Sequence, residues 1–160
     1  MPVNIDIKKK WNGDIVKVQG KSCMQKSIYE IGIIIEGQAK QLAARNYGYM
    51  AASINTQSLG MDHGFEDPSK YAKETPPESH NVSTFRKITK PLDDNTVFVG
   101  TAVDYAPYQE FGTVKMVAQP FLRPSLDLAQ GKTLTIVRLN AKTYFGNYLS
   151  GRDIFLEMNK

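Results

Sequence analysis

The stretch that most constrains the fold is residues 105–126, which reads Y-A-P-Y-Q-E-F-G-T-V-K-M-V-A-Q-P-F-L-R-P-S-L. Proline fixes φ, removes a backbone donor and pushes the preceding residue toward extended geometry. Pro120 and Pro124 therefore predict a rigid, non-helical connection, with a helix starting at or just after Pro124. Gly112 predicts the end of a short helical turn over residues 105–111.

One acid and one arginine lie among the aromatic residues of this stretch. Glu110 and Arg123 are predicted to form a charge-assisted pair, either within one subunit or across an interface. Tyr105, Tyr108 and Phe121 fit a core and an interface equally well, because the centres of interfaces favour Tyr, Phe, Met and Arg. No second carboxylate or base stands at a telling distance from Glu110, so no catalytic role is predicted for it.

The pattern Y-A-x-Y-x-E-F-G-T, then a Met, then P-F-L-R-P-S/A-L, resembles the tail-completion family of long-tailed bacteriophages, described as tail components or head-to-tail joining proteins. Residues 48–54 also resemble a family motif, G-x-L-R-x-S-I, although Met50 replaces the usual Leu and Ala51 the usual basic residue. The matching residues of the main pattern are Tyr105, Ala106, Tyr108, Glu110, Phe111, Gly112, Thr113, Met116, Pro120, Phe121, Leu122, Arg123, Pro124 and Leu126. The motif and interface candidates are Gly48, Ser53, Tyr105, Tyr108, Glu110, Phe111, Gly112, Thr113, Phe121, Arg123 and Pro124.

The resemblance implies a structural virion protein of the phage neck, a ring subunit that completes the tail and joins it to the head. It implies a homo-oligomeric ring, with six subunits expected from the symmetry of the tail. The ring would contact a head-completion or stopper protein on one side and tail-terminator or tail-tube proteins on the other. Genomic DNA would pass through the channel without specific recognition, and the protein would assemble in the host cytoplasm and end in the virion.

The composition is that of an ordinary globular chain. The 160 residues are 41% hydrophobic and 22% charged, which predicts a single domain with its own core. The longest apolar run, residues 31–35, is too short to span a membrane, and the first residues lack the pattern of a signal peptide. Cys23 is the only cysteine, so neither a disulfide framework nor a Cys-rich metal site is predicted.

The charge pattern allows two interpretations, and one alternative function remains to be weighed. Residues 1–60 carry 8 basic and 4 acidic side chains, residues 61–110 carry 5 and 9, and residues 111–160 carry 7 and 3. Solvated faces of mixed sign are the simplest interpretation, and complementary patches between subunits are the sharper one. The alternative function is a DNA-binding accessory protein of phage assembly, favoured by a sequence pI of about 9.1 and eight tyrosines, although basic residues do not gather on one element.

An enzyme is not predicted, and neither is a cofactor. Gly131-Lys132-Thr133 lacks the first glycine of a phosphate-binding loop and lies in a helical pattern. His63 and His80 lie in an acidic loop without ligand spacing, so a solvated loop is expected rather than a metal site. Cys23 is expected to be a small buried hydrophobe. We therefore expect no catalytic and no metal-binding residues.

The rest of the chain predicts an α+β fold. A strand is expected at residues 3–7, and residues 12–20 form either a hairpin or, as we favour from the resemblance, the start of a helix. The helix then continues on an apolar stripe, with Glu36 and Lys40 on the wetter faces. A strand is expected within residues 46–54, followed by a hairpin of residues 82–89 and 96–101. The stripe consists of Met24, Ile28, Ile31, Ile35, Ala39 and Leu42.

The predicted architecture is a mostly antiparallel sheet of about four strands, packed by a long N-terminal helix and a C-terminal helix. Residues 58–81 are predicted to form a long exposed loop that could line the channel of a ring. The C-terminal helix is expected to weaken around Gly131 and to end near Gly146 or Gly151. Residues 152–160 are then left as an arm, with a short strand or a contact to a neighbour at residues 153–157.

Overall fold

The computed structural model describes residues 13–44, 48–73 and 88–157, and for 147–157 the backbone alone. The fold is α+β, with a long helix at each end of the described chain, as predicted. In chain order the elements are α1 (Gly13–Leu42), α2 (Tyr49–Ser53), β1 (Asn55–Gln57), η1 (Pro68–Lys70), β2 (Phe98–Gly100), α3 (Ala106–Phe111) and α4 (Leu122–Glu157).

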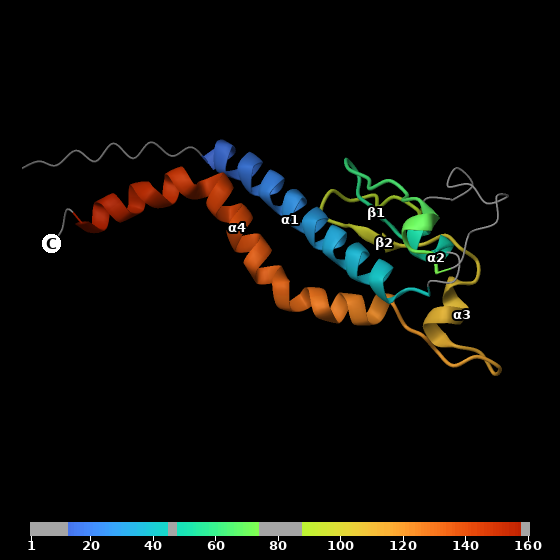
Figure 1. Ribbon diagram of the computed structural model, residues 1–160. Coiled ribbons are helices and arrows are strands. Elements are labelled where there is room, and N and C mark those ends of the chain that lie inside the picture. The colour runs from blue at the N-terminus through green and yellow to red at the C-terminus, as the bar shows by residue number, and fades with distance from the viewer. Residues whose placement is uncertain (1–12, 45–47, 74–87, 158–160) are drawn as a thin grey trace, which may run out of the picture.

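The two long helices lie side by side, and the small sheet packs near the C-terminal end of α1 (Figure 1). The C-terminal part of α4 extends away from the sheet (Figure 1). A polar contact joins the helices, because the Asn140 amide donates hydrogen bonds to Glu30 Oε2 at 2.7 Å and Ser27 Oγ at 3.2 Å. The sheet and α3 therefore form one end of an elongated arrangement.

The sheet has two antiparallel strands in the described residues, so the prediction of about four is wrong for this part of the chain. Asn55 pairs with Gly100 and Gln57 with Phe98. The strand predicted at 96–101 is confirmed in its centre as β2, which pairs with β1. Residues 88–89 are not in a strand, while 3–7 and 82–87 lie outside the described residues.

Helix α1 begins at Gly13, which confirms the helix over the hairpin for the described residues of 12–20. The predicted buried stripe is wrong, since of its six residues only Ala39 is buried and Met24 and Leu42 are exposed. Isoleucines occupy several faces of α1, so periodicity could not select the buried one. Close packing selects it: a Cβ on Gly32 would lie 2.8 Å from Thr56 Cγ2 and 2.9 Å from a Val97 methyl.

Residues 48–54 turn into the sheet through a short helix rather than a strand. Gly48 adopts a left-handed conformation (φ 76°), α2 follows, and β1 starts only at Asn55. A Cβ on Gly48 would lie 2.1 Å from the Pro68 carbonyl oxygen, so this position requires glycine. The main hydrophobic core forms here, from Ala39, Ala43, Met50, Ala51, Ile54, Ala106 and Phe121.

The loop predicted at 58–81 is mostly exposed in its described part, 58–73, as predicted, but it is tied to the rest of the chain at several points. Asp62 forms a bridge with Gln57, η1 follows, and Pro68 is buried against Gly48. Exposed side chains are confirmed at Leu59 and Met61. Residues 74–81 lie outside the described residues, and the docking of this segment in a ring stays a prediction.

Helix α4 starts at Leu122, so the start predicted at or just after Pro124 is wrong by two residues. Pro124 lies in the first turn, where a backbone amide has no intrahelical hydrogen-bond partner to lose. The helix continues through Gly131, Gly146 and Gly151 to Glu157, bending along its length without a break (Figure 1). The predicted ends at Gly146 and Gly151 are therefore wrong, as is the strand at residues 153–157. The contact of residues 152–160 with a neighbour stays a prediction.

Candidate functional site

Helix α3 and the loop after it present the residues of the 105–126 stretch. The predicted end of the helical turn is confirmed at Gly112, whose amide donates to the Tyr108 carbonyl at 2.9 Å and whose φ is 74°. A Cβ at this position would lie 2.7 Å from Ala118 N and 2.9 Å from Met116 O. Gly112 thus lets the chain reverse direction close to the backbone of Met116 and Ala118.

The loop of residues 113–118 is held by its own backbone. Thr113 and Met116 exchange two hydrogen bonds, of 2.8 and 3.2 Å, and the Lys115 amide donates to Thr113 Oγ1 at 3.2 Å. At the base, the Gln119 amide donates to the Gln109 carbonyl at 2.8 Å. These bonds fix the loop to α3 and project its middle residues away from the core.

Glu110 joins α3 to the start of α4. Its buried carboxylate accepts hydrogen bonds from the amides of Phe121 at 2.8 Å, Leu122 at 3.0 Å and Arg123 at 3.1 Å. The first amides of a helix have no intrahelical partner, so a distant side chain supplies the cap here. Burial tends to raise the pKa of the Glu110 carboxyl, but the three amides and the nearby Arg123 charge lower it below its ordinary value.

The predicted Glu110–Arg123 contact exists, but in a different form. The Arg123 backbone amide, rather than its guanidinium, donates to the Glu110 carboxylate. The guanidinium lies over the Phe111 ring, 5.1 Å from its centroid, a cation–π geometry. The guanidinium therefore remains on the surface of the segment, beside the aromatic ring.

The aromatic residues of the segment divide between core and surface. Phe121 is 1% exposed and belongs to the main core, whereas Tyr105, Tyr108 and Phe111 are exposed. Val114 in the loop is fully exposed, and Val117 is 85% exposed. Of the three residues for which the sequence left core and interface open, Phe121 thus lies in the core, and Tyr105 and Tyr108 face solvent.

A groove opens beside these exposed side chains, with a volume of about 590 Å³. Phe121 and Ala106 are its buried residues, besides Glu110, and Asp104 and Arg123 are its exposed charged ones. Its volume is within the range of about 300–1,000 Å³ that binding pockets have. The lining consists of Thr101, Ala102, Val103, Asp104, Ala106, Pro107, Glu110, Phe111, Phe121, Leu122 and Arg123.

The remaining candidates lie elsewhere. Ser53 is buried, and its hydroxyl donates to the Met50 carbonyl at 2.8 Å and lies 2.6 Å from Thr101 Oγ1, next to the groove. Gly48 packs against Pro68 and does not reach the groove. Thr113 closes the loop, and Pro124 lies in the first turn of α4. Only some of the motif and interface candidates predicted from the sequence therefore lie together at the groove beside α3.

A cluster of charged side chains between α1 and residues 56–70 was missed. Lys40, 3% exposed, lies 2.6 Å from Glu36 Oε1 and 2.7 Å from Glu66 Oε1, and Glu36 is 2% exposed. Thr56 Oγ1 donates to Glu36 Oε2 at 2.6 Å, and His63 Nδ1 lies 2.6 Å from Glu36 Oε1. The prediction that Glu36 and Lys40 face water is wrong, and the His63 loop is not simply solvated.

The electrostatics of this cluster follow from its paired charges. Partial burial tends to raise the pKa of the Glu66 carboxyl, but hydrogen bonds with Lys40, Lys70 and Tyr71 outweigh it and lower the pKa to about 2. Burial tends to lower the pKa of Lys40, while its bonds with Glu36 and Glu66 raise it. The only signal in the sequence is the i, i+4 spacing of Glu36 and Lys40, which is equally common on exposed helix faces.

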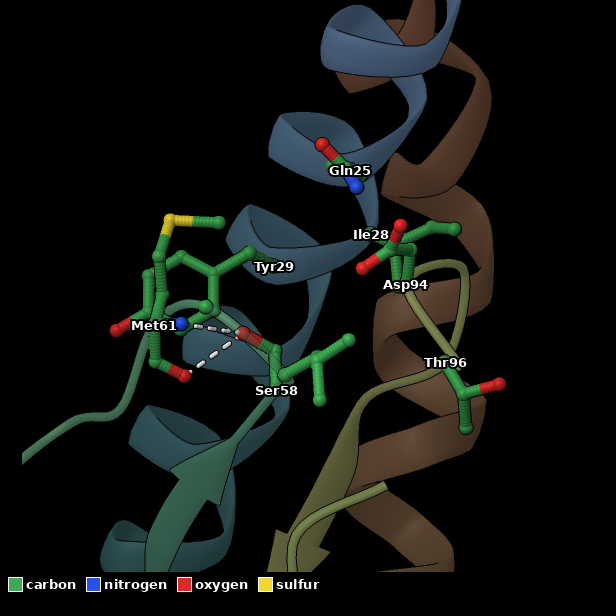
Figure 2. Close-up of a pocket in the computed structure, with 9 residues that line it drawn as sticks. Gln25, Ile28, Tyr29, Ser58, Met61, Asp94 and Thr96 are labelled. Carbon is green, nitrogen blue, oxygen red and sulfur yellow. Dashed lines mark hydrogen bonds between the residues drawn. The ribbon is translucent and has the colours of Figure 1, made fainter. Parts of the chain in front are cut away.

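A second, smaller pocket lies between α1 and the loops that flank the sheet (Figure 2). Its polar side is partly occupied by internal bonds, since Ser58 Oγ donates to the Met61 carbonyl at 2.7 Å and accepts from the Met61 amide at 3.0 Å. The volume of about 80 Å³ admits a few water molecules rather than a substrate. The residues around it are Gln25, Ile28, Tyr29, Ser58, Leu59, Gly60, Met61, Asp94 and Thr96.

The described residues offer little for metal or membrane chemistry. No group of three or more His, Cys, Asp or Glu side chains within them could hold a metal ion. No helix in the described ranges combines the length and the apolar content that crossing a bilayer takes. Cys23 is buried in α1, as predicted. No family model, curated protein or solved structure matched the chain.

Proposed function

We propose that the chain is a structural virion protein of a phage neck, a ring subunit that completes the tail and joins it to the head. The resemblance of residues 105–126 to the tail-completion family supports this function. The protein would act by binding, through contacts with copies of itself and with a head-completion or stopper protein and tail-terminator or tail-tube proteins. It would assemble in the host cytoplasm, with genomic DNA passing through the ring without specific recognition.

The observation that carries the proposal is the combination of rigid anchoring and exposure in the 105–123 segment. Three hydrogen bonds from backbone amides to the Glu110 carboxylate hold the segment on the core, together with the buried Phe121 ring. On this support, Tyr105, Tyr108 and Phe111 expose their rings. Rigid aromatic side chains lose little entropy on contact and dominate the energetics of protein interfaces. An anchored, exposed aromatic surface is therefore suited to a permanent structural contact.

The test is the mass of the purified protein by light scattering, alone and after coexpression with neck and tail proteins encoded beside it. We expect a defined ring or a stable complex with a neck protein. Tyr108→Ser should weaken the assembly at least tenfold, because an exposed interface aromatic is lost without a core contact. Leu92→Ser is the matched control, since Leu92 is also exposed but lies outside the segment.

A wild-type chain that stays monomeric with every neck and tail partner would contradict the proposed function. Strongly salt-dependent DNA binding by that monomer would instead favour the DNA-binding accessory role. Equal loss of assembly in Tyr108→Ser and Leu92→Ser would show that the aromatic segment is not the contact.

A further inference from the structure

The loop after α3 forms a small apolar knob, which we define as residues 113–118. Val114 and Val117 project into solvent, and Lys115 stands between them with its side chain exposed. The Thr113–Met116 bridge and the Gln119–Gln109 bond hold this shape in the free chain. A preformed apolar loop does not lose much entropy when it docks, so it is a suitable element for association.

The groove beside α3 has the complementary chemistry. Its floor contains buried Phe121, and Val103 and Pro107 add apolar surface. The Glu110 carboxylate is committed to three amides, and the Arg123 guanidinium lies over Phe111. Asp104 is exposed on the lining and forms no ion pair within the described part of the chain. The groove thus combines an apolar floor with an exposed acid, Asp104, and with Arg123, whose guanidinium lies over Phe111.

We propose that the knob of one copy docks in the groove of the next, with Lys115 of the first copy paired with Asp104 of the second. The inference rests on the proposed function, for which it identifies the contact between subunits. Knob and groove are different surfaces, so an arrangement in which the knob of each copy enters the groove of the next is head-to-tail. A head-to-tail contact closes into a ring when its rotation closes and otherwise continues as a filament.

Three observations favour a second copy as the occupant. The knob cannot enter its own groove, because the Gln119–Gln109 bond and the packing at Gly112 hold it against α3. The charges match, since Lys115 is the only charged residue of the knob and Asp104 is a groove acid that forms no ion pair with any other described residue. Both surfaces are apolar around these charges, so docking would bury Val114 and Val117 together with the pair.

Charge reversal tests the pairing. Lys115→Asp and Asp104→Lys should each weaken self-association by roughly 100-fold, because like charges then meet in the contact. A mixture of the two single variants should assemble, since each knob then meets a groove of opposite charge. Lys132→Asp in α4 is the matched control and should assemble like the wild type. The measurement is the mass by light scattering over a dilution series, with circular dichroism to confirm folding.

An apolar variant tests the same contact without a charge change. Val117→Ser should weaken association about tenfold and leave the stability of the monomer unchanged, because Val117 makes little contact within the chain. Assembly of both reversed variants at the wild-type concentration would overturn the proposed contact. Failure of the mixture to assemble while the single variants remain folded would overturn it as well.

These results also separate the contact from the proposed function. If the wild-type chain forms a ring or neck complex and both charge reversals leave it intact, the knob-and-groove contact is contradicted and the neck function is not. If the wild-type chain remains monomeric, alone and with neck partners, both the contact and the neck function are contradicted.

Discussion

Two buried glutamates, Glu36 and Glu110, connect distant parts of this molecule, and they are neutralised in different ways. Glu36 lies beside Lys40, Thr56 and His63, side chains from α1, β1 and the following loop. Glu110 accepts bonds from three consecutive backbone amides at the start of α4. The first arrangement depends on the identity of several side chains, whereas the second depends on one acid and on the path of the backbone.

The difference explains what each site can do. Removing one member of a buried ion pair is strongly destabilising, because the other charge is left uncompensated in the protein interior. The Glu36 cluster therefore docks residues 56–70 onto α1 as a unit. The Glu110 cap needs no cation, so the Arg123 guanidinium is left free to lie over Phe111 on the surface. A buried glutamate thus serves two purposes: Glu36 holds a structural cluster, and Glu110 supports an exposed surface.

The largest predicted effect breaks the first arrangement. Lys40→Met should lower the free energy of unfolding by about 3–5 kcal/mol, because two carboxylates lose their buried cation. Lys70→Met is the control: Lys70 binds the same Glu66, but its side chain is largely exposed, so its loss should cost much less than the loss of Lys40. Urea unfolding of both variants measures the difference. Equal losses would show that burial of Lys40 is not what makes the cluster stable.

The second prediction breaks the cap. Glu110→Ala should cost about 2–3 kcal/mol, because three amides at the start of α4 lose a charged acceptor. Glu110→Gln should cost less, since its amide oxygen still accepts. Asp127→Ala, which removes an exposed acid from the same end of α4, is the control and should stay within about 0.5 kcal/mol of the wild type. Urea unfolding that ranks Asp127→Ala with Glu110→Ala would contradict the cap.

The comparison also shows which parts of the fold the sequence could predict. Gly112 ends α3 and Pro124 lies in the first turn of α4 because glycine and proline act through local backbone geometry. The role of Glu110 as a polar link to the 121–123 region was partly visible, since both lie in one short motif. The exact donors were not, because backbone amides carry no signature in the sequence.

The Glu36 cluster was beyond prediction for a physical reason. Its partners Thr56 and His63 lie 20 and 27 positions away, and their approach depends on how residues 48–70 fold back on α1. The buried face of α1 was wrong for a related reason. Its isoleucines offered several apolar faces, and contact with Thr56 at Gly32 selected one that carries charges.

A third, smaller effect concerns acid. The Glu66 pKa falls from an ordinary 4.5 to about 2 in the folded chain. A carboxyl with a lowered folded pKa stabilises the protein above its unfolded pKa and loses this contribution as the pH falls toward the folded value. The free energy of unfolding should therefore decline between about pH 5 and pH 2, and Glu66→Gln should make this decline shallower.

The Glu110 pKa is lowered too, so Glu110→Gln should also flatten the acid limb. Glu66 and Glu110 share no bonding partner, so their effects on the pH slope should add. Urea unfolding of the two single variants and the double variant across this pH range measures whether the changes in slope add. A slope that neither substitution changes would show that other carboxyls dominate acid unfolding.

The smallest predicted effect compares two glycines, Gly112 at the end of α3 and Gly131 inside α4. Gly112→Ala should cost about 1–2 kcal/mol, because φ is 74° and the new Cβ would lie 2.7 Å from Ala118 N, an atom of the backbone that cannot rotate away. Gly131→Ala, inside α4 with nothing within 4 Å of the added Cβ, should instead stabilise by up to about 1 kcal/mol. Thermal unfolding distinguishes the opposite signs. If both substitutions stabilise, the loop of residues 113–118 relaxes easily around Gly112, and the preformed knob loses its physical basis.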